Sequence, residues 1–217
     1  MRDQPVTPEL DVQERQELCN CLERLGPAAP TLCDGWTTAD LAAHLVVRER
    51  RPASWPGILL GGRFDKVTRR AMAAELAGGY DRVIQRIRSG PPVLLRSTPL
   101  RYAADLAEFT IHHEDVRRAQ GQGPRNDRLD LEYGIWTLLD RLAPLMVTKA
   151  RLRPISLNLR APGFGERQVG RGDRRVAITG QPVELLLYLY GRARVAQVEI
   201  LGRPHHVSAV RETSFSA

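Results

Sequence analysis

A short polar stretch, Glu108 to Asp115, holds the residue types best suited to chemistry in this chain. It lies inside the run 101–119, which contains no Gly or Pro, so a helix can pass through it without interruption. Residues about one turn apart stack on one face of a helix, which places Glu108, His112 and Asp115 on a single polar stripe. A carboxylate and an imidazole one turn apart can bind a divalent metal through two donor atoms. A third donor must then come from elsewhere in the chain.

His44 is the best candidate for this third donor. The second predicted helix begins at a capping box formed by Thr37 and Asp40 and stops before Pro52. His44 shares a face of that helix with leucines, so its side chain is expected to point inward. An inward histidine taken alone is more often a hydrogen-bonded core residue than a ligand.

The two adjacent histidines, His112 and His113, are not equivalent. Neighbouring residues on a helix point about 100° apart, so both imidazoles cannot face one metal. His112 lies one turn from Glu108 and on its face, and we therefore predict that it is the ligand. His113 is expected to pack against a neighbouring helix or to shape the pocket.

Composition and charge narrow the function classes. The chain has 217 residues, a net charge of +7 and a pI of about 9.9, yet Lys occurs only at positions 66 and 149. Its arginines are interspersed with acids and form no basic block, so binding to nucleic acid is not expected. No apolar run could span a bilayer and no signal-peptide core is present, so the expected protein makes no membrane contact and is cytoplasmic.

The three cysteines predict reduced thiols. Cys19, Cys21 and Cys33 are odd in number and lie near one end, which is not the pattern of a disulfide framework. Cys33 lies just before the helix of His44, so it is the one plausible protein nucleophile near the predicted metal.

Hydrophobic periodicity predicts an α+β chain with two domains. Residues 1–152 are expected to form helices and residues 153–217 a small α+β unit. The predicted helices are 7–25, 37–51, 64–88 with a break at Gly78-Gly79, 101–119, 129–151, 182–190 and 204–211, and the strands are 155–159, 175–179 and 195–201.

Three stretches, 31–45, 108–115 and 179–192, resemble a known family in sequence and in order. They are similar to the actinobacterial branch of the DinB-like superfamily, the mycothiol-dependent maleylpyruvate isomerase family, some of whose members are recorded only as metal-binding proteins. The resemblance implies a DinB-like four-helix bundle carrying a divalent metal, usually zinc, followed by a small α/β domain similar to sterol-carrier modules. Matched by motif, the implied metal ligands are His44, Glu108 and His112.

The resemblance also implies a reaction. Family members use a low-molecular-weight thiol, mycothiol, as cofactor in isomerase or S-transferase reactions on small electrophilic substrates. Two His and one Glu leave a coordination position open, and zinc there would lower the pKa of a bound thiol and create a nucleophilic thiolate.

Two further residues are candidate catalytic residues. Asp115 could orient a metal ligand, or it could form a surface salt bridge with Arg117 or Arg118. Arg48, one turn after His44, could hold a substrate carboxylate at the site mouth, or it could form a surface ion pair.

Two other functions remain open on the sequence alone. The metal could serve a reaction that needs no thiol, such as that of a lyase, cyclase or hydrolase. Alternatively, the scaffold could be a non-enzymatic, metal-dependent binding protein. Short motifs do not reveal thiol contacts, so the sequence does not separate these functions, nor does it give the oligomeric state.

Overall fold

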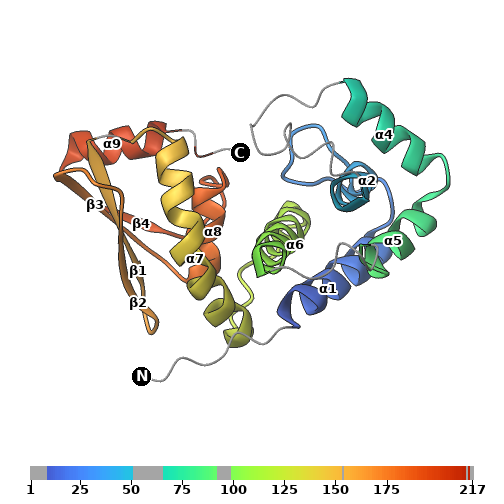
Figure 1. The fold of residues 1–217 in the computed structure, drawn as a ribbon, viewed down its shortest axis with the longest axis horizontal. Coiled ribbons are helices and arrows are strands. Elements are labelled where there is room, and N and C mark those ends of the chain that lie inside the picture. The colour runs from blue at the N-terminus through green and yellow to red at the C-terminus, as the bar shows by residue number, and fades with distance from the viewer. Residues whose placement is uncertain (1–8, 51–65, 92–98, 153, 214, 216–217) are drawn as a thin grey trace. The chain divides into compact units, whose positions relative to one another are not determined.

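The computed structural model describes residues 9–50, 66–91, 99–152, 154–213 and 215. It divides into two compact units, one spanning Pro8–Arg125 and one running from Asn126 to the C-terminus. The first is helical, and the second combines helices with a four-stranded sheet (Figure 1). The α+β prediction is therefore confirmed. Among the described helices, none is both long and apolar enough to cross a membrane.

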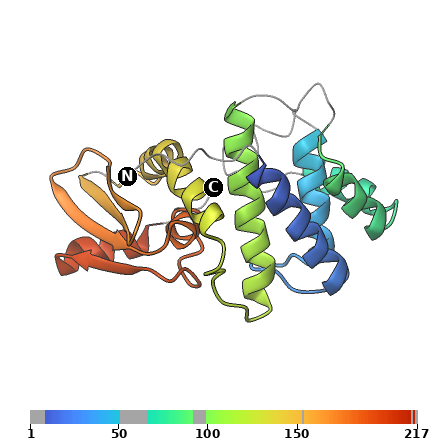
Figure 2. The same ribbon diagram turned by 90° about the horizontal axis from the view of Figure 1, so that it is seen from below.

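The helical unit is built around one apolar core that four helices share. Its elements are α1 (Leu10–Leu25), α2 (Thr38–Arg50), α4 (Lys66–Leu76), α5 (Tyr80–Arg88) and α6 (Pro99–Ala119). Helices α1, α2, α5 and α6 contribute fully buried side chains to this core, among them Leu22, Leu45, Ile84 and Phe109. Helix α4 instead packs on α2, with Ala71 and Met72 against Ala43 and Val47. The predicted four-helix bundle is confirmed, and Figure 2 shows α6 passing alongside α1.

Local signals set the helix ends that matter for the site. The Thr37 backbone N–H donates to Asp40 Oδ2 at 2.9 Å, and the Asp40 N–H donates back to Thr37 Oγ1 at 3.4 Å. This is the predicted capping box, and it fixes the start of the helix that carries His44. Gly79, with a φ of 91°, separates α4 from α5, as the paired glycines predicted.

The second unit contains a mixed sheet. Its elements are α7 (Leu129–Lys149), β1 (Ile155–Ala161), β2 (Gly165–Val169), β3 (Arg174–Thr179), α8 (Pro182–Leu189), β4 (Glu199–Gly202) and α9 (Pro204–Glu212). The strand order is β2-β1-β3-β4; β1 and β3 are parallel, and the two outer pairs are antiparallel. Leu157, Leu159 and Ile178 alternate into the buried side, and Figure 1 places α7 and α8 together on one side of the sheet.

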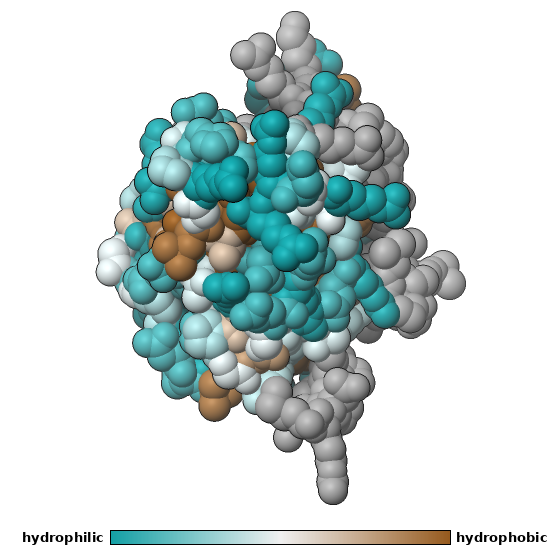
Figure 3. All heavy atoms as spheres, turned by 90° about the vertical axis from the view of Figure 1, so that its left-hand side faces the viewer, coloured by the Kyte–Doolittle hydropathy of each residue, from teal (hydrophilic) through white to brown (hydrophobic). Residues whose placement is uncertain are grey.

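The other side of the sheet is polar. Asn158 and Arg160 on β1 both contact Glu166 on β2, through a hydrogen bond of 3.0 Å and an ion pair of 3.3 Å. Figure 3 views the molecule from this side and shows a mainly hydrophilic surface with small hydrophobic patches. Such alternation is typical of a sheet that is covered on one face and solvated on the other.

The structure differs from the sequence expectations in two places. The compact units divide between Arg125 and Asn126, whereas the sequence placed the domain boundary after residue 152. Helix α7 belongs with the sheet because it packs against α8, and its Glu132 side chain accepts a hydrogen bond from the Val183 N–H at 2.9 Å. Strand β2 was not predicted, because its sequence, Gly-Glu-Arg-Gln-Val, is almost entirely polar, as an edge strand can be.

Candidate metal centre

Helices α2 and α6 bring the three predicted ligand side chains together. His44 Nε2 and His112 Nε2 each lie 3.2 Å from Glu108 Oε1, and the two imidazole centroids are 5.5 Å apart. One donor atom from each residue lies within 4.8 Å of the other two. Donor atoms 64 residues apart in sequence therefore converge on one point, and two imidazoles with one carboxylate form a set that suits zinc or a similar divalent metal.

Burial gives these groups unusual acid–base properties. Burial disfavours the charged form of His44 and lowers its pKa. For Glu108, burial also disfavours the charged form and so raises the pKa. The charge of Arg48 and the hydrogen bonds with the imidazoles outweigh burial and hold the pKa of Glu108 well below its usual value. For His112, burial is outweighed by hydrogen bonds with Asp115 and Cys33, so the pKa lies well above its usual value. A proton on His112 is the positive charge that a bound metal would have to replace.

Asp115 lies on the far side of the His112 ring. Its Oδ2 is 2.9 Å from His112 Nδ1, and its side chain is fully buried. The alternative partners, Arg117 and Arg118, instead pair with Glu114 at 2.8 and 2.7 Å. A carboxylate that accepts the Nδ1 proton leaves the Nε2 lone pair directed toward Glu108, as a metal ligand requires.

Arg48 contacts the same carboxylate that the histidines contact. Its Nε is 3.3 Å from Glu108 Oε1, and its Nη1 donates to Asp105 Oδ1 at 3.1 Å. Beyond Asp105, Arg15 forms a buried pair with Glu49 at 2.6 Å. The guanidinium of Arg48 therefore holds Glu108 in place and keeps it ionised. Its predicted contact with a substrate carboxylate stays a prediction.

The connector between α1 and α2 forms a further wall of the site. The Trp36 ring lies 5.2 Å from the His44 ring, and Cys33 Sγ lies 3.3 Å from Asp115 Oδ2. On the sequence alone, Cys33 is a possible nucleophile and Trp36 has no predicted partner. Their contacts with the ligand histidine and the supporting carboxylate could not be inferred, because no local pattern indicates where a connector folds back.

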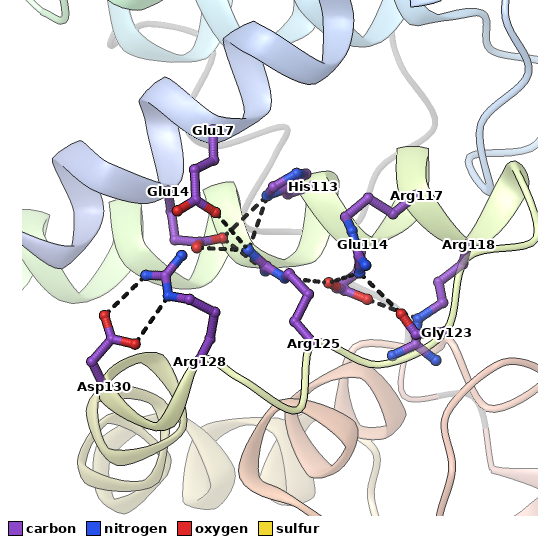
Figure 4. Close-up of polar contacts among 10 residues, drawn as sticks. All are labelled: Glu14, Glu17, His113, Glu114, Arg117, Arg118, Gly123, Arg125, Arg128 and Asp130. Atoms are coloured by element: carbon purple, nitrogen blue, oxygen red, sulfur yellow. Dashed lines mark hydrogen bonds and ion pairs between the residues drawn. The ribbon is translucent and has the colours of Figure 1, made fainter.

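His113 lies in a different cluster of charged side chains, which Figure 4 shows. Its Nδ1 is 3.4 Å from Glu14 Oε2 and 3.1 Å from Arg125 Nη1. Arg125 also binds Glu14 through two bonds of 2.8 and 2.9 Å, and contacts Glu17 and Glu114. His113 and two glutamates could hold a metal by distance alone, but a guanidinium already contacts all three.

The charge balance separates the two clusters. The contacts that extend from the His44 site join four carboxylates to two guanidinium groups: Glu49, Asp105, Glu108 and Asp115 against Arg15 and Arg48. In the His113 cluster the two signs match: Glu14, Glu17 and Glu114 against Arg117, Arg118 and Arg125. The first cluster has two more carboxylates than guanidinium groups, and the proton on His112 balances one of them. A divalent cation that replaced this proton would balance both, so the residues present fit such an ion.

Comparison with known proteins supports the fold and gives no closer relationship. No family model and no curated protein sequence matches the chain. Two solved structures do: the crystal structure of the mycothiol-dependent maleylpyruvate isomerase, with a TM-score of 0.55, and that of a histidine-to-alanine mutant of that enzyme, with a TM-score of 0.56. In each case the identity is 13%, and the match covers 91% of this chain and 93% of the other. The chain therefore has the fold of that isomerase.

Proposed function

We propose that this protein binds a divalent metal, for which its donor set favours zinc, and uses it to activate a low-molecular-weight thiol. The proposed reaction is isomerisation or S-transfer on a small electrophilic substrate. The observation that carries the proposal is the convergence of His44, Glu108 and His112 from two helices, in a chain whose fold matches a mycothiol-dependent isomerase. Mycothiol and maleylpyruvate, which that structure's name mentions, are accordingly the first thiol and substrate to test.

The protein's own residues have defined tasks in this proposal. Two imidazoles and one carboxylate hold the metal and leave a coordination position for another donor. A metal held there supplies Lewis acidity, which lowers the pKa of a thiol that binds it. Asp115 keeps the proton of His112 on Nδ1, and Arg48 keeps Glu108 ionised by contact at 3.3 Å. The nucleophile comes from the added thiol.

The test is a turnover assay on the full chain loaded with Zn²⁺. We expect product, separated from the substrate by liquid chromatography and identified by mass spectrometry, when mycothiol and maleylpyruvate or another conjugated electrophile are supplied together. Product should be lost on omission of the thiol, on metal removal and in His44→Ala. The matched control is His205→Ala, which removes an exposed histidine from α9 and should leave turnover unchanged.

Two outcomes of the same assay would contradict the proposed thiol-dependent mechanism. Turnover that requires the metal but continues without any thiol would contradict thiol activation and favour a thiol-independent metalloenzyme. Turnover that survives both metal removal and His44→Ala would contradict the metal centre itself.

A further inference from the structure

The connector residue Cys33 contacts the carboxylate that supports His112. Its Sγ–H donates to Asp115 Oδ2 at 3.3 Å, and His112 Nδ1 lies 2.9 Å from that same oxygen. Asp115 is fully buried, so its orientation depends on the donors around it. One oxygen thus links the connector thiol to the proposed ligand.

The connector is held firmly where the thiol makes this contact. The Leu32 N–H donates to the backbone oxygen of Asp115 at 3.1 Å, so the same helical residue is contacted through both its side chain and its backbone. The Cys33 N–H donates to Thr31 Oγ1 at 3.2 Å, and the Cys33 carbonyl accepts from the Trp36 N–H at 2.9 Å. These bonds fix the Cys33 backbone on both sides of the thiol.

A role as a direct ligand fits the distances less well. His112 Nε2 faces Glu108, whereas Cys33 Sγ is 3.9 Å from Nδ1, on the opposite edge of the ring. A metal bound between Cys33, His112 and Asp115 would have to replace the proton in the short contact between His112 and Asp115. The hydrogen-bonded arrangement needs no such change.

We propose that Cys33 is a positioning residue for the metal centre: its thiol orients the Asp115 carboxylate, which orients His112. The inference rests on the proposed metal site and goes beyond it, since it assigns a function to the one cysteine that is only partly buried. The thiol is a weak donor, so its effect through Asp115 should be smaller than the effect of Asp115 itself. We expect Cys33→Ala to weaken metal binding about 3- to 10-fold, less than the roughly 10- to 100-fold loss typical of residues that contact a ligand directly.

The experiment is a Co²⁺ titration of the full chain, in which a competing chelator gives the dissociation constant and absorption spectra report the ligands. Cys33→Ala should bind more weakly, while Cys33→Ser, which keeps a donor, should recover most of the affinity. The matched control, Cys21→Ala, removes a thiol buried in α1 and should bind as the wild type does. Asp115→Ala should bind at least 10-fold more weakly, and adding Cys33→Ala to it should cause no further loss, because the thiol acts through that carboxylate. Circular dichroism verifies that each variant is folded.

Three outcomes would overturn the inference. A cysteine thiolate-to-cobalt charge-transfer band that disappears in Cys33→Ala would make Cys33 a ligand. Equal affinities of the wild type and Cys33→Ala, or an undiminished Cys33→Ala effect in the Asp115→Ala background, would show that the thiol does not act through Asp115. Failure of the wild type to bind Co²⁺ would instead contradict the metal centre, and with it the proposed function.

Discussion

His112 and His113 are adjacent on α6, and each lies among carboxylates that could hold a metal, yet the two surroundings differ in one respect. Around His113, the guanidinium of Arg125 contacts both Glu14 and the imidazole. Around His112, two imidazoles converge on Glu108, and the carboxylates in contact outnumber the guanidinium groups. The same donor types therefore form a structural ion-pair network where guanidinium groups balance the carboxylates, and a candidate metal centre where the carboxylates outnumber the guanidinium groups.

The largest expected effect comes from removing the internal cation. Arg125→Met leaves Glu14 and Glu114 buried without the guanidinium that joins them, which should lower the free energy of unfolding by about 3–5 kcal/mol. Urea denaturation of the metal-free chain measures this loss. The matched control is Arg160→Met, because Arg160 pairs with Glu166 and both side chains are exposed, so its removal should cost less than about 1 kcal/mol.

Equal destabilisation by these two substitutions would mean that the Arg125 network is no more than a surface contact. Metal binding by Arg125→Met should remain at the wild-type stoichiometry at the His44 site, since Arg125 does not contact those ligands. Loss of that metal would show that the Arg125 network and the His44 site depend on each other, which would contradict their separation into two independent clusters.

A smaller effect should appear on acidification. Burial tends to raise the pKa of Glu14, but hydrogen bonds with His113 and Arg125 outweigh it and lower the pKa to about 2, below its usual 4.5. A depressed carboxyl pKa contributes stability that is fully present above about pH 4.5 and is lost as the pH falls toward 2. The stability gap between the wild type and Arg125→Met should therefore narrow between pH 6 and pH 3 in urea titrations of the metal-free chain. A gap that stays constant over this interval would show that Glu14 is not the group stabilised by Arg125.

The sequence was most informative where one helix carries the signal. The spacing of Glu108, His112 and Asp115 predicted a polar stripe. In the structure, Glu108 and Asp115 contact the two ring nitrogens of His112. The helix starting at Thr37 was likewise predictable, because a capping box is a local pattern. The α+β class followed from a change in hydrophobic period near residue 153.

Contacts between distant segments were not predictable in the same way. Arg125 meets Glu14 across 111 residues, and neither local sequence distinguishes this pair from surface charges. Arg48 was expected at the mouth of the site, yet its guanidinium contacts Glu108 and Asp105, because the facing helix brings both carboxylates within reach. The sequence analysis placed helix α7 in the first domain, because no local pattern indicates that this helix packs against α8.

Metal content is the most direct test of the account, measured by inductively coupled plasma mass spectrometry on wild type, His112→Ala and His113→Ala purified without chelator and reconstituted with Zn²⁺. We expect about one metal per chain for the wild type and for His113→Ala, and none for His112→Ala, because of these two histidines His112 is the one that directs a ring nitrogen at Glu108 beside His44. Circular dichroism verifies that both variants are folded. A metal-free His113→Ala beside a metal-replete His112→Ala would contradict the account.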